Sequence, residues 1–69
     1  MKTNEESKIK MDTQMMSLME EQLNQEALMY KKYLNFAEKI YDSELKNIFF
    51  EASEKHKQNY LDILSYLKL

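Results

Sequence analysis

The 69-residue sequence contains neither glycine nor proline. These are the two residue types that most often end a helix, so nothing in the chain obliges the backbone to leave one. Glutamate, lysine, leucine, methionine and glutamine, which are good helix formers, are abundant. We therefore predict an all-α fold. A chain of this length makes one small domain whose own core is marginal, and self-association is the expected remedy.

Charge and composition exclude several classes of function. The net charge is −2, and all ten basic residues are lysines. Without arginine or a basic cluster, binding to nucleic acid is not expected. The lack of cysteine excludes disulfides and thiolate metal sites. The first twenty residues hold no apolar run long enough for a signal peptide or a membrane span, so we expect no membrane partner and a cytoplasmic location.

The apolar pattern predicts a first helix over about residues 11–41, because apolar residues recur there at intervals of three and four. The main stripe consists of Met15, Met19, Leu23, Ala27, Tyr30, Leu34, Ala37 and Tyr41. A second stripe beside it consists of Met11, Leu18, Met29 and Phe36. Together they widen the apolar arc to about half the circumference, so this helix is expected to contact more than one neighbour. We interpret the methionines as packing residues rather than thioether ligands.

A second helix is predicted over about residues 43–68. Its apolar stripe consists of Leu45, Phe49, Ala52, Ser53, His56, Tyr60, Ile63 and Leu67. Asp42 and Ser43 are good N-cap residues, so we predict a connection there and an antiparallel two-helix hairpin over residues 11–69. One continuous coiled-coil helix is the alternative, because no glycine marks the connection. The polar residues 1–10 are predicted to be a flexible segment.

Glu26 is the anomaly of the first helix, because it lies on the apolar face. A buried carboxylate costs several kcal/mol unless it has a partner. The only histidine, His56, lies at nearly the same distance from the connection, about 21–24 Å at 1.5 Å per residue. A hydrogen-bonded Glu26–His56 pair near Tyr30 and Tyr60 is therefore the leading interpretation. A neutral core histidine with Glu26 reaching solvent, or a bound metal, are the others.

These residues give the chain a resemblance to a known family. The residues concerned are Glu26 and Tyr33, Ala37-Glu38, Asp42-x-Glu44-Leu45-Lys46, Phe49, and then His56 followed by Tyr60-Leu61-x-Ile63-Leu64. Their pattern is similar to one hairpin of the ferritin-like superfamily, especially its rubrerythrin-type members. More loosely, the chain resembles the coat-protein-F-like spore proteins. The match covers about residues 23–67. It implies a bacterial protein whose hairpins dimerise into a four-helix bundle.

The resemblance also implies a metal site, which this sequence carries only in part. In the family each hairpin supplies a Glu from its first helix and a Glu-x-x-His from its second. Glu26 and His56 match two of these positions, but the Glu of the second motif is replaced by Ser53. Two chains together would supply two Glu and two His, enough for one Fe, Mn or Zn ion. The missing carboxylate favours a protein that is not an enzyme and holds no cofactor.

Two main hypotheses of function follow. The first is a small, non-enzymatic, self-associating protein with a structural or protein-interaction role, in the cytoplasm or in a spore coat. The second is a metal-binding ferritin-like half-bundle, with Glu26 and His56 as ligands, whose site is completed by a partner chain. A third possibility is an adaptor whose methionine-rich first helix docks onto a larger protein.

Overall fold

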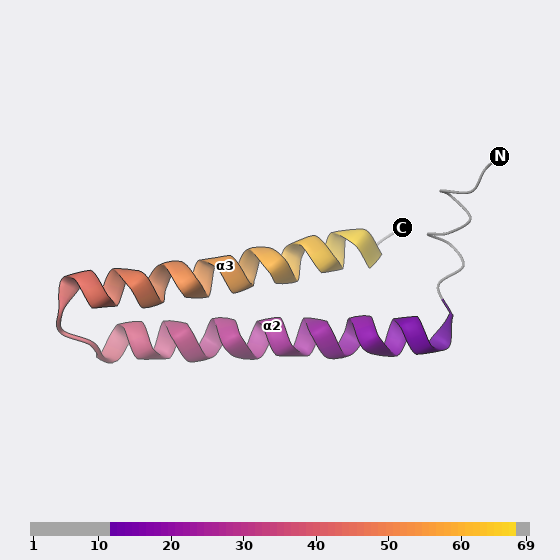
Figure 1. Cartoon of the computed structure of the whole chain (residues 1–69), viewed down its shortest axis with the longest axis horizontal. Coiled ribbons are helices and arrows are strands. Elements are labelled where there is room, and N and C mark those ends of the chain that lie inside the picture. Colours follow the sequence, from indigo (N-terminus) through magenta and orange to yellow (C-terminus); the bar gives the residue numbers. More distant parts are fainter. Residues whose placement is uncertain (1–11, 68–69) are drawn as a thin grey trace.

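A computed structural model describes residues 12–67 as two helices, α2 (Thr13–Lys39) and α3 (Ser43–Leu67). They pack against each other in opposite directions as a hairpin (Figure 1). No strand occurs within this part of the chain. The predicted all-α hairpin is thus confirmed, and the alternative of one continuous helix is wrong. The segment 1–10, predicted to be flexible, lies outside the described residues.

An aspartate caps the N-terminus of each helix. The Asp12 carboxylate accepts a hydrogen bond from the Met15 backbone N–H at 2.8 Å. The Asp42 carboxylate accepts one from the Leu45 backbone N–H, also at 2.8 Å. Each bond satisfies one of the N–H groups that a helix leaves unpaired in its first turn. The helices therefore begin at Thr13 and Ser43, each directly after its aspartate.

The connection ends α2 two residues before the predicted position. Ile40 takes an extended conformation (φ −97°, ψ 134°), and its N–H donates to the Ala37 carbonyl. The Lys46 ammonium reaches back from α3 to donate to the same Ala37 carbonyl at 2.7 Å, and to that of Ile40 at 3.4 Å. A lysine from the next helix therefore donates to the carbonyls at the C-terminus of α2. In many other helices a turn through a glycine in the left-handed conformation satisfies such carbonyls.

The seam between the helices is narrow, and none of the large apolar side chains of the described residues is fully buried in it. Within residues 12–67 the buried residues are Glu26, Ala37 and Ser53, the last of them fully enclosed. Ala37 is the only hydrophobic one among them. Ala37, near the connection, and Ser53, close to the middle of α3, are both small, and a carboxylate occupies the middle of α2. The hairpin alone therefore has almost no closed apolar core.

Nearly half of the large apolar side chains in residues 12–67 are exposed and the others are only half-buried, because a pair of helices buries only one stripe of each. The exposed ones are Met15, Met16, Leu18, Leu28, Phe36, Tyr41, Leu45, Ile48, Phe50, Leu61 and Tyr66. Their exposed fractions run from 39% for Met16 to 102% for Tyr41. The wide apolar arc predicted for the first helix is thus present without a second neighbour to cover it. Neither of the two described helices is long and apolar enough to cross a membrane.

The N-cap of α3 can be tested by substitution. Replacing Asp42 with alanine removes the acceptor for the Leu45 N–H, and we expect a loss of about 1 kcal/mol in the free energy of unfolding. Urea denaturation followed by circular dichroism measures this loss. Asp42→Ser, which keeps an acceptor, is expected to retain most of the stability. Equal stability of Asp42→Ala and the parent chain would contradict the assigned cap.

Candidate functional site

Glu26 on α2 and His56 on α3 meet at the seam. The Nδ1 atom of His56 lies 2.6 Å from Oε1 of Glu26. The Glu26 side chain is 11% exposed and that of His56 is 27% exposed, so the pair is mostly enclosed but not sealed. The structure therefore brings together the two residues that the sequence singles out. Their similar distances from the connection place them at the same level of the hairpin.

Two amides complete the hydrogen bonding of the carboxylate. The Gln22 side chain, one turn earlier on α2, donates to Oε2 of Glu26 at 2.9 Å. The Asn59 side chain, on α3, donates to Oε1 at 3.3 Å. Neither amide was predicted from the sequence, although each lies three or four residues from a member of the pair and so on the same side of its helix. Among the described residues, no buried side-chain nitrogen or oxygen lacks a partner.

These contacts keep Glu26 ionised. The hydrogen bond from His56 lowers the pKa of Glu26 below its ordinary value of 4.5, and the bonds from Asn59 and Gln22 lower it further, against the opposing effect of burial. An ionised carboxylate accepts hydrogen bonds only, so Nδ1 of His56 is the donor in this pair. The other ring nitrogen, Nε2, is then the atom through which His56 can meet a further group.

An aromatic cluster holds the histidine ring on the side toward the connection. The Tyr33 ring stacks on His56, with ring centroids 5.5 Å apart and planes 23° from parallel. Tyr33 also contacts Phe36 and Phe49, which contact each other edge to face. The cluster fixes the orientation of the imidazole in addition to the hydrogen bond to Glu26.

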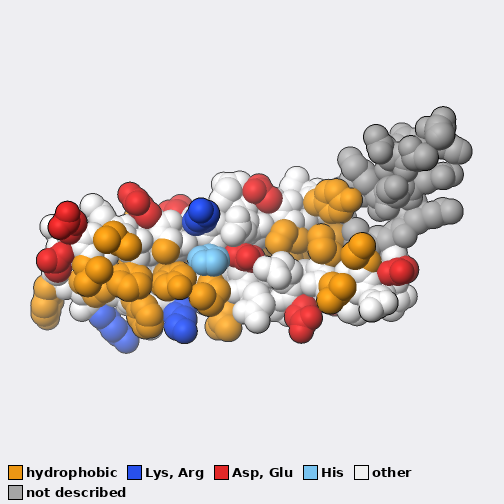
Figure 2. Space-filling model, viewed as in Figure 1, with side chains coloured by type: hydrophobic (Ala, Val, Ile, Leu, Met, Phe, Trp, Pro, Cys, Tyr) orange, Lys and Arg blue, Asp and Glu red, His pale blue; other side chains and the backbone are white. Residues whose placement is uncertain are grey.

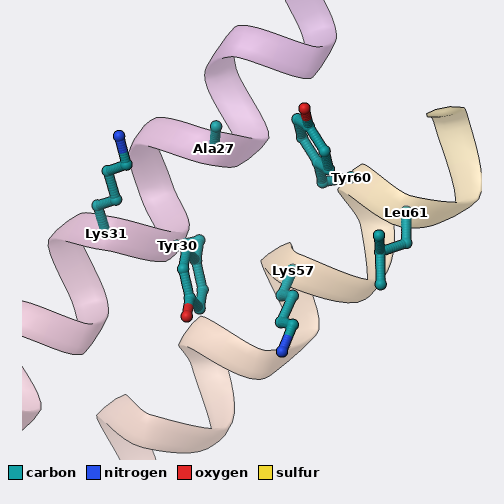
Figure 3. Close-up of a pocket in the computed structure, with 6 residues that line it drawn as sticks. All are labelled: Ala27, Tyr30, Lys31, Lys57, Tyr60 and Leu61. Atoms are coloured by element: carbon teal, nitrogen blue, oxygen red, sulfur yellow. The ribbon is translucent and has the colours of Figure 1, made fainter.

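Tyr30 and Tyr60, which the sequence analysis places near the pair, line a hollow between the helices. Ala27, Lys31, Lys57 and Leu61 complete its lining. In Figure 3 the side chains of Lys31 and Lys57 extend in opposite directions, so their ammonium groups do not converge on one point. The hollow is apolar, with one lysine on each helix at its rim. The aromatic ring that contacts His56 is that of Tyr33.

Ser53, which replaces the expected Glu, packs in the seam one turn before His56. It is fully buried, and its hydroxyl donates to the Phe50 carbonyl at 2.6 Å. The hydroxyl proton of Ser53 is thereby used in a hydrogen bond within α3 and is not donated to His56. A glutamate side chain at the same position would have to fit where no surface is left open.

A single chain does not assemble a metal site in the described region. Within residues 12–67 no three His, Cys, Asp or Glu side chains lie close enough to hold an ion together. Glu26 and His56 are also bonded to each other, so both could bind an ion directly only by giving up that bond. If an ion were bound, the residues present would fit a different arrangement, in which Glu26 orients His56 and Nε2 would be the ligand atom.

The hairpin has two different faces. The first, which we call the His56 face, carries Met15, Leu18, Met29 and Phe36 on α2 with Leu45, Ile48 and Tyr66 on α3, by helical phase and by the contacts above. The second, which we call the lysine face, carries Lys31 and Lys57 with Leu34, Phe50 and Leu61. Figure 2 shows the face on which the histidine is visible.

Fold and site together define a helical hairpin with an oriented Glu–His pair at its centre. Comparisons with protein-family models, curated proteins and solved structures gave no match for this chain.

The lowered pKa of Glu26 makes stability depend on pH in a defined direction. A carboxyl group whose pKa is lower in the folded state stabilises the fold above its unfolded-state value of about 4.5, and the stabilisation is lost as the pH falls through the folded value. We expect Glu26→Gln to be less stable than the parent at pH 7 and to lose less stability on acidification. Urea denaturation at fixed protein concentration between pH 7 and pH 3 measures both.

Glu54→Gln is the matched control for the removed charge, because Glu54 lies on the exposed side of α3. It should keep the acid sensitivity of the parent chain. Parallel stability curves for Glu26→Gln and the parent would show that the pair does not stabilise the fold.

Proposed function

We propose that this chain is a small, non-enzymatic protein that self-associates, with two hairpins forming a four-helix bundle of the ferritin-like kind. Its role is then structural, or that of a protein-interaction module. The observation that supports self-association is that eleven large apolar side chains of the described region are exposed, whereas Ala37 is its only buried hydrophobic residue. An isolated hairpin of this kind is marginal in water, since helices gain most of their stability from packing of an apolar face.

The site supports a non-enzymatic role. The buried hydroxyl of Ser53 donates to a backbone carbonyl, and Glu26 is engaged by three side chains, so the pair behaves as a satisfied polar contact within the seam. The resemblance to ferritin-like hairpins and spore proteins favours a bacterial protein, in the cytoplasm or alternatively in a spore coat. The adaptor hypothesis, in which α2 docks onto a larger protein, predicts instead a chain that stays monomeric alone.

Self-association is tested by sedimentation together with thermal unfolding. We expect a dimer at micromolar concentration, and a melting temperature that rises with protein concentration because association stabilises the folded state by mass action. A hundredfold concentration range gives a measurable shift. A monomer throughout that range, with one constant melting temperature, would contradict the proposal and favour the adaptor.

Metal binding is the second candidate function, and the orientation of His56 favours it. A histidine that binds a metal usually donates its other ring N–H to a carboxylate, as Nδ1 of His56 does to Glu26. A Zn, Fe or Mn ion would polarise a bound water or ligand. Nε2 of His56 would hold the ion, Glu26 would orient the ring, and a partner chain would supply the further donors that this chain lacks.

Titration of the metal-free protein with Zn²⁺, Fe²⁺ or Mn²⁺, followed by calorimetry, tests the second candidate. The metal hypothesis predicts one ion per two chains, with binding lost in His56→Ala and weakened in Glu26→Gln. Our structural proposal predicts that any weak binding is the same in all three proteins. Stoichiometric binding that His56→Ala abolishes would overturn it.

A further inference from the structure

The Glu26–His56 pair lies at the midpoint of both helices. α2 spans Thr13–Lys39 and α3 spans Ser43–Leu67, so Glu26 is the central residue of the first and His56 is one residue past the centre of the second. A residue at the end of a helix would meet a different part of the partner in each orientation of a dimer. A residue at the centre meets the centre of the partner in either orientation. The pairing proposed below rests on this property and on the proposed self-association.

The His56 face carries apolar side chains on both sides of this midpoint. Figure 2 shows one apolar group over the half nearer the connection and another over the open half. The pale blue histidine and an adjacent acidic side chain lie between them. By their positions along the helices, Phe36, Leu45 and Ile48 of the His56 face belong to the half nearer the connection, and Met15, Leu18 and Tyr66 belong to the open half. The face thus carries two apolar groups with the polar pair between them, and charged side chains lie along its edges.

The size of this face matches that of a second copy. Helices of 27 and 25 residues are about 40 Å long, and two of them side by side are about 20 Å wide. The footprint is therefore about 800 Å², which is the area that each partner buries in a typical stable interface. A short peptide or a single helix would leave about half of this face uncovered.

The lysine face is less suited to pairing with its own copy. Its large exposed apolar residues are fewer, chiefly Phe50 and Leu61. Lys31 and Lys57 stand at the rim of its central hollow. A two-fold pairing on this face would therefore bury less apolar surface.

We propose that a second copy covers the His56 face with its helix midpoints over those of the first, so that two Glu26–His56 pairs form one polar layer at the centre of the dimer. In a two-fold dimer with full overlap, the central layer meets its own copy whether the helices of the copies run in the same or in opposite directions. Each copy then contributes half of the layer.

The layer also fixes the alignment of the two copies. A shift of one copy along the other would place each Glu26–His56 pair against methionine or aromatic side chains, where its polar atoms would lose water without gaining a partner. A single polar layer in an otherwise apolar bundle is a known means of specifying register. The pair would thus select one alignment from the several that the apolar groups alone allow.

Cysteine cross-linking tests the proposal cleanly because the chain has no cysteine of its own. An equal mixture of the single variants Gln25→Cys and Lys55→Cys places thiols at the midpoint on the His56 side of the two helices. A mixture of Lys31→Cys and Lys57→Cys places them near the same level on the lysine face. All four positions are exposed, so the substitutions should not disturb the fold. The readout is the rate of covalent dimer formation under mild oxidation.

We expect the His56-face mixture to cross-link at least tenfold faster than the lysine-face mixture, and the two rates to become equal in denaturing urea. Adding Ile48→Lys to the first mixture should slow its cross-linking, whereas Phe50→Lys, a matched change two residues further on the other face, should not. Both isoleucine and phenylalanine are exposed at these positions, so neither change opens a cavity.

The outcomes separate the inference from the proposal on which it rests. If the parent chain sediments as a monomer at micromolar concentration, self-association itself is wrong. If the parent is a dimer but the lysine-face mixture links as fast or faster, self-association stands and the assignment of the His56 face is wrong. A dimer in which the His56-face mixture links selectively, and loses this on Ile48→Lys, supports both.

Discussion

Two helices share only one line of contact, and this limit governs the whole molecule. A hairpin buries one narrow stripe of each helix, whereas α2 carries an apolar arc about half its circumference wide. The result is a seam in which Ala37 is the only buried hydrophobic residue of the described region, with many larger side chains outside it. The stability of such a chain depends on what covers those side chains. A second copy is the partner for which the dimensions of the His56 face and its exposed apolar side chains argue most directly.

The seam itself is organised by its polar contacts more than by its apolar ones. Asp12 and Asp42 set where the helices begin, and Lys46 from α3 satisfies the carbonyls that end α2. At the centre, three side chains donate to Glu26, so its buried charge is compensated. Small buried residues lie in the seam at two levels, with Ala37 near the connection and Ser53 close to the middle of α3. Specific hydrogen bonds at the connection and at the centre of the helices thus align α2 with α3.

The sequence was sufficient to predict the helices, their connection and the pairing of Glu26 with His56, because each depends on periodicity, cap chemistry or chain length. It did not predict Gln22 and Asn59 as partners of Glu26, since an exposed-looking amide gives no sign of which nearby carboxylate it will bind. Nor did it predict that Tyr33 would be the ring stacked on His56, because Tyr30 lies only one turn earlier on the same helix and periodicity does not decide between the two. The reach of Lys46 depends on the geometry of the connection, which periodicity does not encode.

The most direct test of our account is an isotope-filtered NOE measurement on an equal mixture of ¹³C-labelled and unlabelled chains, which detects only contacts between copies. The account predicts intermolecular NOEs to the methyl groups of Leu18, Met29 and Ile48, and none to those of Leu61. Intermolecular NOEs confined to Leu61 and its neighbours, or none in a sample that sediments as a dimer, would contradict it.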